Sequence, residues 1–276
     1  MKSLSRRRMI AVVAGAVVLP KILNAATIGS VSFDVREFGA VGDGERVNTA
    51  SIQKAIDACS ASGGESVWIA QGRYVTGTLF LKSNVMLTIE PGGVLLGSTK
   101  IEDYAQGTGR NMYAHETQLD RCLIFAQDAV NVGIHGMGTI NGQGKSFPNS
   151  ADATKSRPML LRLINCRNVS LRDVTLENPA AWTSAFLYCT NVRVDGINIS
   201  SRANGNGDGL DFDGCQDVRI SNCRLDNSDD SICLQSSDPT KPVRNVVITN
   251  CMMTSQWAAS FSSVRLILSR CVCGKR

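Results

Sequence analysis

The sequence predicts an all-β protein, a right-handed parallel β-helix, on two observations. From Ser66 onward, short apolar runs alternate with Gly, Asn and Asp, and no second helix of convincing period follows. One strand-turn pattern also recurs, with its valines 23, 26 and 28 residues apart at Val169, Val192, Val218 and Val246. A repeat of this length fits one coil of a solenoid, whereas a sandwich or barrel need not repeat its register.

The repeated segments set the extent of the solenoid. Four copies align over residues 168–176, 191–199, 217–225 and 245–253, and residues 84–89 and 131–140 are earlier copies. We therefore expect a β-helix domain over residues 27–259. Residues 260–276 match no earlier coil, which indicates a truncated or frameshifted product of low solubility with an uncovered last coil. The alternative is a short natural protein whose tail adds a terminal strand containing Val264, Leu266 and Leu268.

An N-terminal cap is predicted over residues 31–64, and it contains the one confident helix. Asn48 or Thr49 begins this helix, and Gly63-Gly64 ends it. The apolar positions follow the i, i+3, i+4, i+7 pattern of an amphipathic helix at Ile52, Ala55, Ile56 and Cys59. A helix ahead of a long β run is expected to cover the open end of the sheet that follows.

Residues 1–26 have the pattern of an export signal. Arginines at positions 6–8 precede an apolar run over 9–19, and small residues follow at 24–26, as they do at a signal-peptide cleavage site. The twin arginines favour the Tat route, with an ordinary Sec signal as the alternative. The apolar run is too short for an uncleaved membrane anchor. We therefore expect an exported protein, periplasmic or extracellular, with no stable membrane association.

Charge excludes a nucleic-acid partner. The first 21 residues hold five of the 29 basic side chains and no acid, and the remaining 24 basic residues balance the 24 acidic ones. The formal charge of +5 therefore belongs to the predicted signal, and the rest of the chain has no basic patch.

Ten cysteines in an exported chain usually indicate disulfides, but their positions favour another interpretation. Cys166, Cys189 and Cys215 each lie three residues before the valine that opens a strand, and Cys223 and Cys251 share a second register position. Residues that repeat in register stack in a solenoid, where cysteine serves as a small buried hydrophobe. The sequence predicts stacked thiols, and one or two disulfides remain the alternative.

The candidate catalytic residues lie between residues 206 and 237. Asp208 lies in an Asn-Gly-Asp-Gly turn, and the pair Asp229-Asp230 follows 21 and 22 residues later. Because one coil of sequence returns the chain to a neighbouring rung roughly 4.8 Å away, these three carboxylates should meet in space. The alternative is that they are ordinary loop corners, because Asn, Gly, Asp and Ser are the usual residues of turns.

The same stretch resembles glycoside hydrolase family 28, the polygalacturonases and their relatives. In that family an Asn-x-Asp motif is followed about one coil later by an Asp-Asp pair. The N-terminal cap, the turn Gly138–Gly144 and the Arg157-Pro158 dipeptide also resemble family segments. The resemblance implies cleavage of α-1,4-galacturonan or a related pectic polysaccharide by single displacement with inversion. It implies no cofactor and no metal, and we expect a monomer.

Roles for single residues also follow from the resemblance. Asp229 would be the general acid, and Asp208 and Asp230 would position and deprotonate the water. Candidate substrate-binding residues are Asn206, Trp182 and Gln235. Trp182 is either a sugar-stacking platform or a core residue.

The sequence departs from the family in one place. A Gly-His-Gly is expected one coil after the Asp pair, with an Arg-Ile-Lys later that holds a substrate carboxylate. Here residues 255–259 read Ser-Gln-Trp-Ala-Ala, and both histidines, His115 and His135, lie upstream of Asp208. Two alternatives therefore stay open: a Ca²⁺-dependent polysaccharide lyase of the same fold, or an inactive carbohydrate-binding pseudoenzyme.

Overall fold

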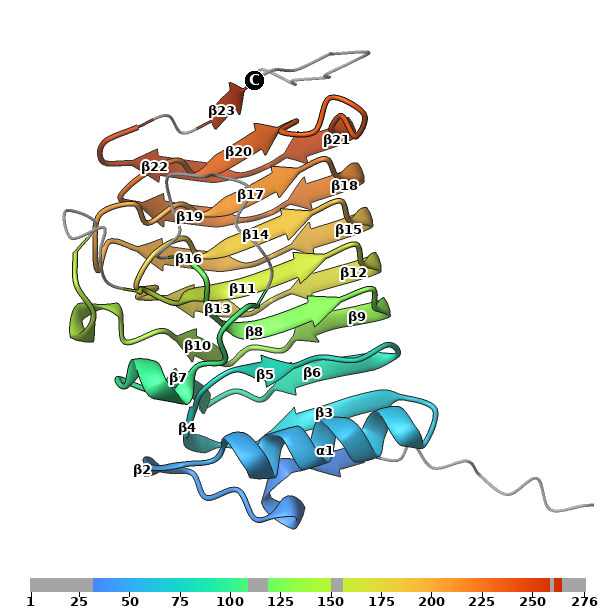
Figure 1. Ribbon diagram of the computed structural model, residues 1–276, viewed down its shortest axis with the longest axis vertical. Helices are drawn as coiled ribbons and strands as arrows, with labels where there is room; N and C mark the ends of the chain where they lie inside the picture. Colours follow the sequence, from blue (N-terminus) through green and yellow to red (C-terminus); the bar gives the residue numbers. More distant parts are fainter. Residues whose placement is uncertain (1–31, 109–118, 150–155, 259–260, 265–276) are drawn as a thin grey trace, which may run out of the picture. The chain divides into compact units, whose positions relative to one another are not determined.

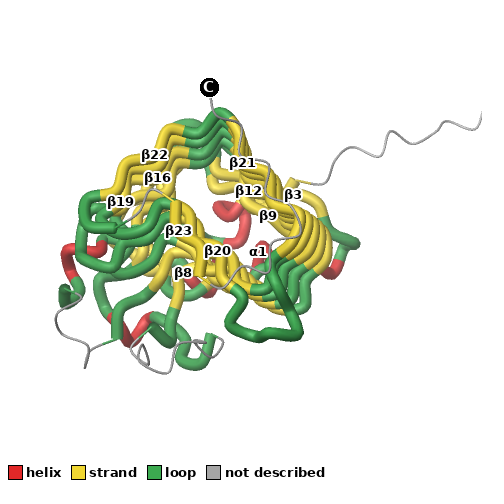
Figure 2. The backbone as a smooth tube through the Cα atoms, turned by 90° about the horizontal axis from the view of Figure 1, so that it is seen from above, coloured by secondary structure: helices red, strands yellow, loops and turns green. Residues whose placement is uncertain are grey.

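The strands form three parallel sheets that coil around one interior. The computed structural model describes residues 32–108, 119–149, 156–258 and 261–264. In each sheet every strand pairs in parallel with its neighbours, and the chain visits sheet A, sheet B and sheet C in turn (Figures 1 and 2). This is a right-handed parallel β-helix, as the sequence predicts.

The strands are short, as a coil with three turns requires. Sheet A contains β1 (Ser32–Asp34), β3 (Glu65–Ile69), β6 (Val85–Ile89), β9 (Val130–His135), β12 (Arg167–Arg172), β15 (Thr190–Asp195), β18 (Gln216–Ser221) and β21 (Arg244–Thr249). Sheet B contains β2 (Asp43–Val47), β4 (Gly72–Thr76), β7 (Gly93–Gly97), β10 (Thr139–Asn141), β13 (Thr175–Glu177), β16 (Asn198–Ser201), β19 (Arg224–Asn227) and β22 (Met252–Ser255). Sheet C contains β5 (Leu79–Phe80), β8 (Cys122–Gln127), β11 (Met159–Ile164), β14 (Ser184–Leu187), β17 (Leu210–Asp213), β20 (Ile232–Gln235) and β23 (Phe261–Val264).

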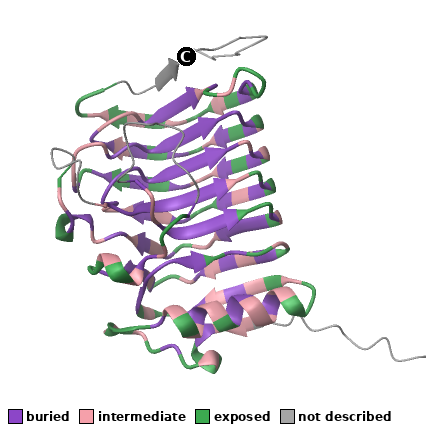
Figure 3. Cartoon of the chain, viewed as in Figure 1, coloured by how far each residue is buried: buried purple, intermediate pink, exposed green. Residues whose placement is uncertain are grey.

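The register is the one that the repeated valines predict. Val169 pairs with Val192, Val192 with Val218, and Val218 with Val246 on successive strands of sheet A. These side chains are at most 8% exposed and alternate with exposed ones, so each strand buries one face in the interior (Figure 3). A slip of one residue would move every valine to the solvent face, which is why the register is strongly specified.

Asparagine side chains stabilise the corners of the coil. Asn84, Asn131, Asn168 and Asn191 all have φ between 51° and 63°, a left-handed conformation that asparagine tolerates well. Asn131, Asn168 and Asn191 each donate the side-chain amide to the asparagine one coil below, over distances of 2.8–2.9 Å. Along this column the asparagine side chains therefore point the same way on successive coils.

The helix α1 (Thr49–Ala61) covers the first coil, as predicted (Figure 1). Ile52, Ala55, Ile56 and Cys59 are its buried face, and α1 packs on β1, β3, β5 and β6. Asn48 occupies the N-cap position without capping the helix through its side chain. Its amide instead bonds the backbone of Val41 and Arg46, which fixes the segment that leads into the helix. Three 3₁₀ turns complete the elements: η1 (Val35–Phe38), η2 (Ile101–Asp103) and η3 (Gly144–Ser146).

The cysteines of the described residues are free thiols, and five of them are stacked in register. The backbone N–H of Thr190 bonds the carbonyl of Cys166, and that of Gln216 bonds Cys189, so Cys166, Cys189 and Cys215 form one buried column. Cys223 and Cys251 form a second column, in which only Cys251 is partly exposed. The prediction of stacked thiols is confirmed for these five cysteines.

The export signal over residues 1–26 and residues 265–276 of the tail lie outside the described residues. Past Ala259, however, the strand register continues, because β23 pairs in parallel with β20 from Phe261 to Val264. Within the described part of the chain, no helix has both the length and the apolar character that a membrane span needs.

Candidate active site

Three carboxylates meet where sheet B turns into sheet C. Asp208 ends the turn between β16 and β17, and Asp229 and Asp230 lie in the turn between β19 and β20. One oxygen from each carboxylate lies within 4.8 Å of one from each of the others. The one-coil spacing therefore predicts their meeting correctly. We call Asp208, Asp229 and Asp230 the acid cluster, and the turns that link sheet B to sheet C the B–C corner.

Backbone pairing between the two turns fixes the acid cluster. Gly209 donates its N–H to the carbonyl of Asp230 over 2.8 Å, and Leu210 donates to Ser231 over 3.0 Å. Asp208 and Asp230 are therefore register partners on adjacent coils. Thr183 donates its N–H to the carbonyl of Asp208 over 2.8 Å, which continues the same column one coil lower.

A buried serine ties the turn of Asp208 to the coil above it. Ser228 is 2% exposed, accepts the N–H of Gly207 over 3.1 Å and donates to the carbonyl of Asn204 over 2.7 Å. Its hydroxyl therefore satisfies one donor and one acceptor of the turn that carries Asp208. The hydroxyl of Ser201 bonds the carbonyl of Gly207 from below over 2.6 Å.

Glycine is required at Gly207 by the close approach of these hydroxyls. A Cβ atom at this position would lie 2.6 Å from both Ser201 Oγ and Ser228 Oγ, and closer still to the Ser201 carbonyl. Real Cβ atoms do not approach other atoms so closely. The glycine that precedes Asp208 therefore serves packing, not only turn flexibility.

A buried arginine supports the same turn from the lower coils. Arg157 is 1% exposed, and its Nη1 donates to the carbonyls of Ala180 and Gly205 over 3.0 Å each. Asn204 also donates to the carbonyl of Gly144 over 2.7 Å. Neither residue is assigned a role by sequence reasoning, although the Arg157-Pro158 dipeptide is a possible signal.

Electrostatics distinguish Asp229 within the acid cluster. Burial raises the pKa of Asp229, and the neighbouring Asp230 carboxylate raises it further. A hydrogen bond of 3.0 Å from the Asp230 N–H to Asp229 Oδ1 opposes these effects in part. Asp229 is therefore the carboxyl that retains a proton to a higher pH than an ordinary aspartate. Three carboxylate oxygens this close could also hold a cation.

The three predicted substrate-binding residues lie in different surroundings. Asn206 is half-buried, has φ of 58°, and lies in the turn that carries Asp208. Gln235 lies at the end of β20 farthest from Asp230, and its amide bonds Cys233 Sγ over 3.0 Å. Of these two residues, only Asn206 is therefore next to the acid cluster.

Trp182 is packed rather than presented to solvent. It is 7% exposed and belongs to an apolar cluster on the outer face of sheet C. The members of this cluster include Leu119, Cys122, Phe125, Met159 and Leu187. A stacking platform needs an open ring face, so these surroundings support the packing role, one of the two alternatives for this residue.

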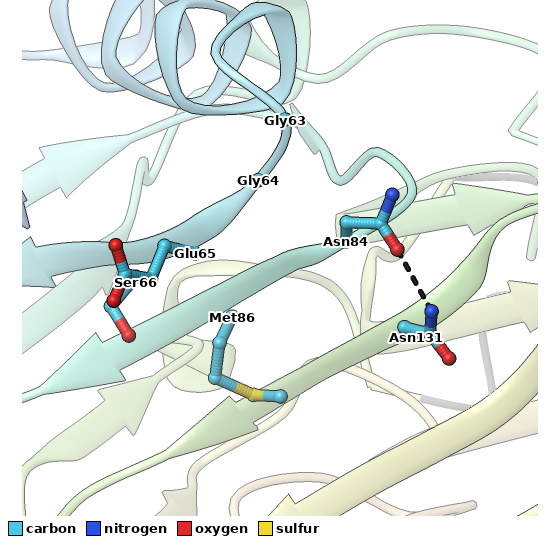
Figure 4. Close-up of a pocket in the computed structure, with 7 residues that line it drawn as sticks. All are labelled: Gly63, Gly64, Glu65, Ser66, Asn84, Met86 and Asn131. Carbon is cyan, nitrogen blue, oxygen red and sulfur yellow. Dashed lines mark hydrogen bonds between the residues drawn. The ribbon is translucent and has the colours of Figure 1, made fainter. Parts of the chain in front are cut away.

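Two hollows lie elsewhere on the described surface. A cavity of about 450 Å³ on the B–C corner, several coils below the acid cluster, is lined by residues that include Lys100, Arg121 and Phe147. A second cavity of about 380 Å³ lies beside the start of β3, where Asn84 bonds Asn131 (Figure 4). Only the first shares a corner with the acid cluster.

The fold and the acid cluster together define a class of protein. A parallel β-helix whose one corner gathers three carboxylates, with one pKa raised, has the features of an acid–base site. Comparison with known proteins gives the family. Residues 59–264 match the family described as glycosyl hydrolases family 28, and the chain belongs to that family.

Relatives in sequence agree with this assignment. The chain is 30% identical over 215 residues to a probable polygalacturonase of Vitis vinifera, covering 72% of this chain and 43% of the relative. It is 27% identical over 288 residues to an exo-poly-alpha-D-galacturonosidase of Dickeya chrysanthemi, covering 84% of this chain and 46% of the relative. The chain thus spans less than half the length of these two relatives.

Solved structures show the same architecture. The family 28 exopolygalacturonase of Yersinia enterocolitica superposes with a TM-score of 0.67 at 26% identity, covering 84% of this chain and 50% of that one. An exopolygalacturonase of Thermotoga maritima superposes with a TM-score of 0.73 at 24% identity, covering 86% and 63%. At 24% identity the second likeness supports the fold alone.

Proposed function

We propose that this chain hydrolyses α-1,4-galacturonan or a closely related pectic polysaccharide by single displacement with inversion. The observation that carries the proposal is the acid cluster, in which Asp208, Asp229 and Asp230 meet on one corner of a family 28 fold. Membership of that family supports the reaction class. The polygalacturonase names of the relatives support the substrate class.

Asp229 is the proposed general acid, and Asp208 with Asp230 the proposed base that holds the water. A general acid must be protonated at the working pH, and burial together with Asp230 moves the pKa of Asp229 in that direction. Protonated Asp229 would donate to the glycosidic oxygen. The other two carboxylates would orient a water and take its proton as it attacks the anomeric carbon from the opposite face.

The spacing of the acid cluster makes stereochemistry the informative readout. Typical inverting pairs have carboxyl groups roughly 6.5–9.5 Å apart, and retaining pairs roughly 5–5.5 Å. The nearest oxygens here lie within 4.8 Å, and nearest-oxygen distances are shorter than distances between whole carboxyl groups. The anomeric form of the first product, observed by proton NMR, is expected to be inverted. A retained anomer would overturn the single-displacement mechanism.

Release of reducing ends from demethylated polygalacturonate tests the reaction itself. We expect Asp229→Asn to abolish hydrolysis while oligogalacturonate still binds. A matched control is Asp173→Asn, because Asp173 is exposed and has φ of 60°, a conformation that asparagine also accepts. An active Asp229→Asn variant would contradict the assignment of the acid. An unsaturated product that absorbs in the ultraviolet would instead show the lyase reaction and overturn hydrolysis.

We also infer that the chain is exported and acts as a monomer. The support for export is the basic, apolar and small-residue pattern of residues 1–26. Fractionation of expressing cells is expected to place the processed protein outside the cytoplasm. Size-exclusion chromatography is expected to give the mass of one chain, and a stable dimer would contradict the second inference.

A further inference from the structure

Trp257 is the most exposed large hydrophobic side chain of the described residues. It is 77% exposed, whereas Trp182 is 7% exposed and Trp68 is half-buried. Tryptophan is highly buried on average, so the largely exposed indole of Trp257 differs from the other two tryptophans of the chain.

Backbone pairing places Trp257 directly above Asp229. Asn227 pairs with Ser255 at the end of β19 and β22. The ladder continues into the turn, where Gln256 donates its N–H to Asn227 over 3.1 Å and Trp257 donates to Ser228 over 3.2 Å. Trp257 is therefore the register partner of Asp229, one rung of roughly 4.8 Å away.

Along the regular asparagine column, register partners direct their side chains alike. The amides of Asn131 and Asn168 each reach the side chain one coil below. Asp229 directs its carboxylate into the acid cluster. Trp257, largely exposed and one rung above Asp229, therefore belongs to the same corner as the carboxyl assigned as general acid.

We propose that Trp257 is the stacking platform for a pyranose ring of the polysaccharide, at the subsite next to Asp229. The inference rests on the proposed function and deepens it. A pyranose ring has one face of C–H groups, and an indole offers a rigid apolar surface of matching size at low entropic cost. Contact between the two removes apolar area from water without needing a charge. The platform would hold a sugar in the part of the chain where the family's Gly-His-Gly is absent.

Intrinsic fluorescence tests the platform directly, because the chain has only three tryptophans. The probe is trigalacturonate, titrated into Asp229→Asn so that the sugar is not cleaved. We expect quenching or a blue shift that disappears when Trp257→Phe is added and persists when Trp182→Phe is added. Loss of the signal with Trp182→Phe but not Trp257→Phe would overturn the proposal.

Kinetics separate a platform from a merely structural residue. We expect Trp257→Ala to raise KM on polygalacturonate roughly tenfold, a usual loss for a buried aromatic contact, with kcat nearly unchanged. Trp257→Phe should recover part of the affinity, and the melting temperature should not change. An unchanged KM in an active Trp257→Ala enzyme overturns the platform while the proposed function stands. Absence of both hydrolysis and trigalacturonate binding in every variant overturns the two together.

Discussion

Removing the hydroxyl of Ser228 should lower both the stability of the coil and the catalytic rate, because this hydroxyl holds the turn that carries Asp208. The change is Ser228→Ala, which leaves the buried N–H of Gly207 without its acceptor, 3.1 Å away, and frees the Asn204 carbonyl. A buried donor left unsatisfied costs about 1–3 kcal/mol, so we expect a loss near 2 kcal/mol. In a chain of this size that corresponds to a fall of roughly 4–8 °C in melting temperature. Because the turn also carries Asp208, kcat should fall by roughly 10- to 100-fold.

The matched control is Thr78→Val, which removes the same kind of hydroxyl away from the acid cluster. Thr78 is 4% exposed, donates to the Cys122 carbonyl over 2.7 Å and accepts the N–H of Ala105 over 2.9 Å. Calorimetry should show similar losses of stability for both variants. Hydrolysis of polygalacturonate, measured well below both melting temperatures, should fall only for Ser228→Ala. Equal kcat values for the two variants would refute the positioning role of Ser228.

Three further predictions follow from the corner and from the thiol columns. Activity should fall as pH rises through the raised pKa of Asp229. The free energy of unfolding should fall over the same pH window, because the folded state holds that proton to a higher pH than the unfolded state does. In a pH series of thermal melts, Asp229→Asn should remove this loss of stability. Gly207→Ala should destabilise by about 1–3 kcal/mol and reduce kcat in the same assay, because the new methyl meets Ser228 Oγ. A hydrogen bond with Cys223 lowers the pKa of Cys251 to about 7. Cys251 should therefore be alkylated by iodoacetamide at pH 8 before the buried thiols. Peptide mapping that finds a buried thiol alkylated first would contradict this prediction.

The coil itself could be predicted because its signals are local and repeated. Valine spacing fixed the pairing of Val169 with Val192 and of Val192 with Val218. The same repeat predicted that Asp208 and the Asp229-Asp230 pair would meet, because a one-coil separation in sequence becomes one rung in space. Each of these predictions needs only the period and the alternation of buried residues.

Side-chain surroundings could not be predicted in the same way. Trp182 is a register partner of Asp208, yet its ring packs with Leu119 and Phe125, which come from segments far away in sequence. Gln235 follows the Asp pair closely in sequence, but β20 carries it away from the corner. The repeat places residues 255–259 one coil after the Asp pair, but coil length varies from 23 to 28 residues, so only the backbone ladder shows that Trp257 is the register partner of Asp229.

The acid cluster forms because two sets of register partners, one continuing from sheet B and one leading into sheet C, come together at the B–C corner. Asp208 and Asp230 belong to the column set by sheet C, whereas Asp229 and Trp257 belong to the column set by sheet B. In the lower turn, residues 204–207 lie between the two columns, and in the upper turn Asp229 directly precedes Asp230. The tight upper turn therefore forces two carboxyls together, and the longer lower turn leaves room for the side chains that hold Asp208. Lengthening the upper turn by one residue should separate Asp229 from Asp230 without disturbing either sheet, and hydrolysis should be lost while the melt stays cooperative.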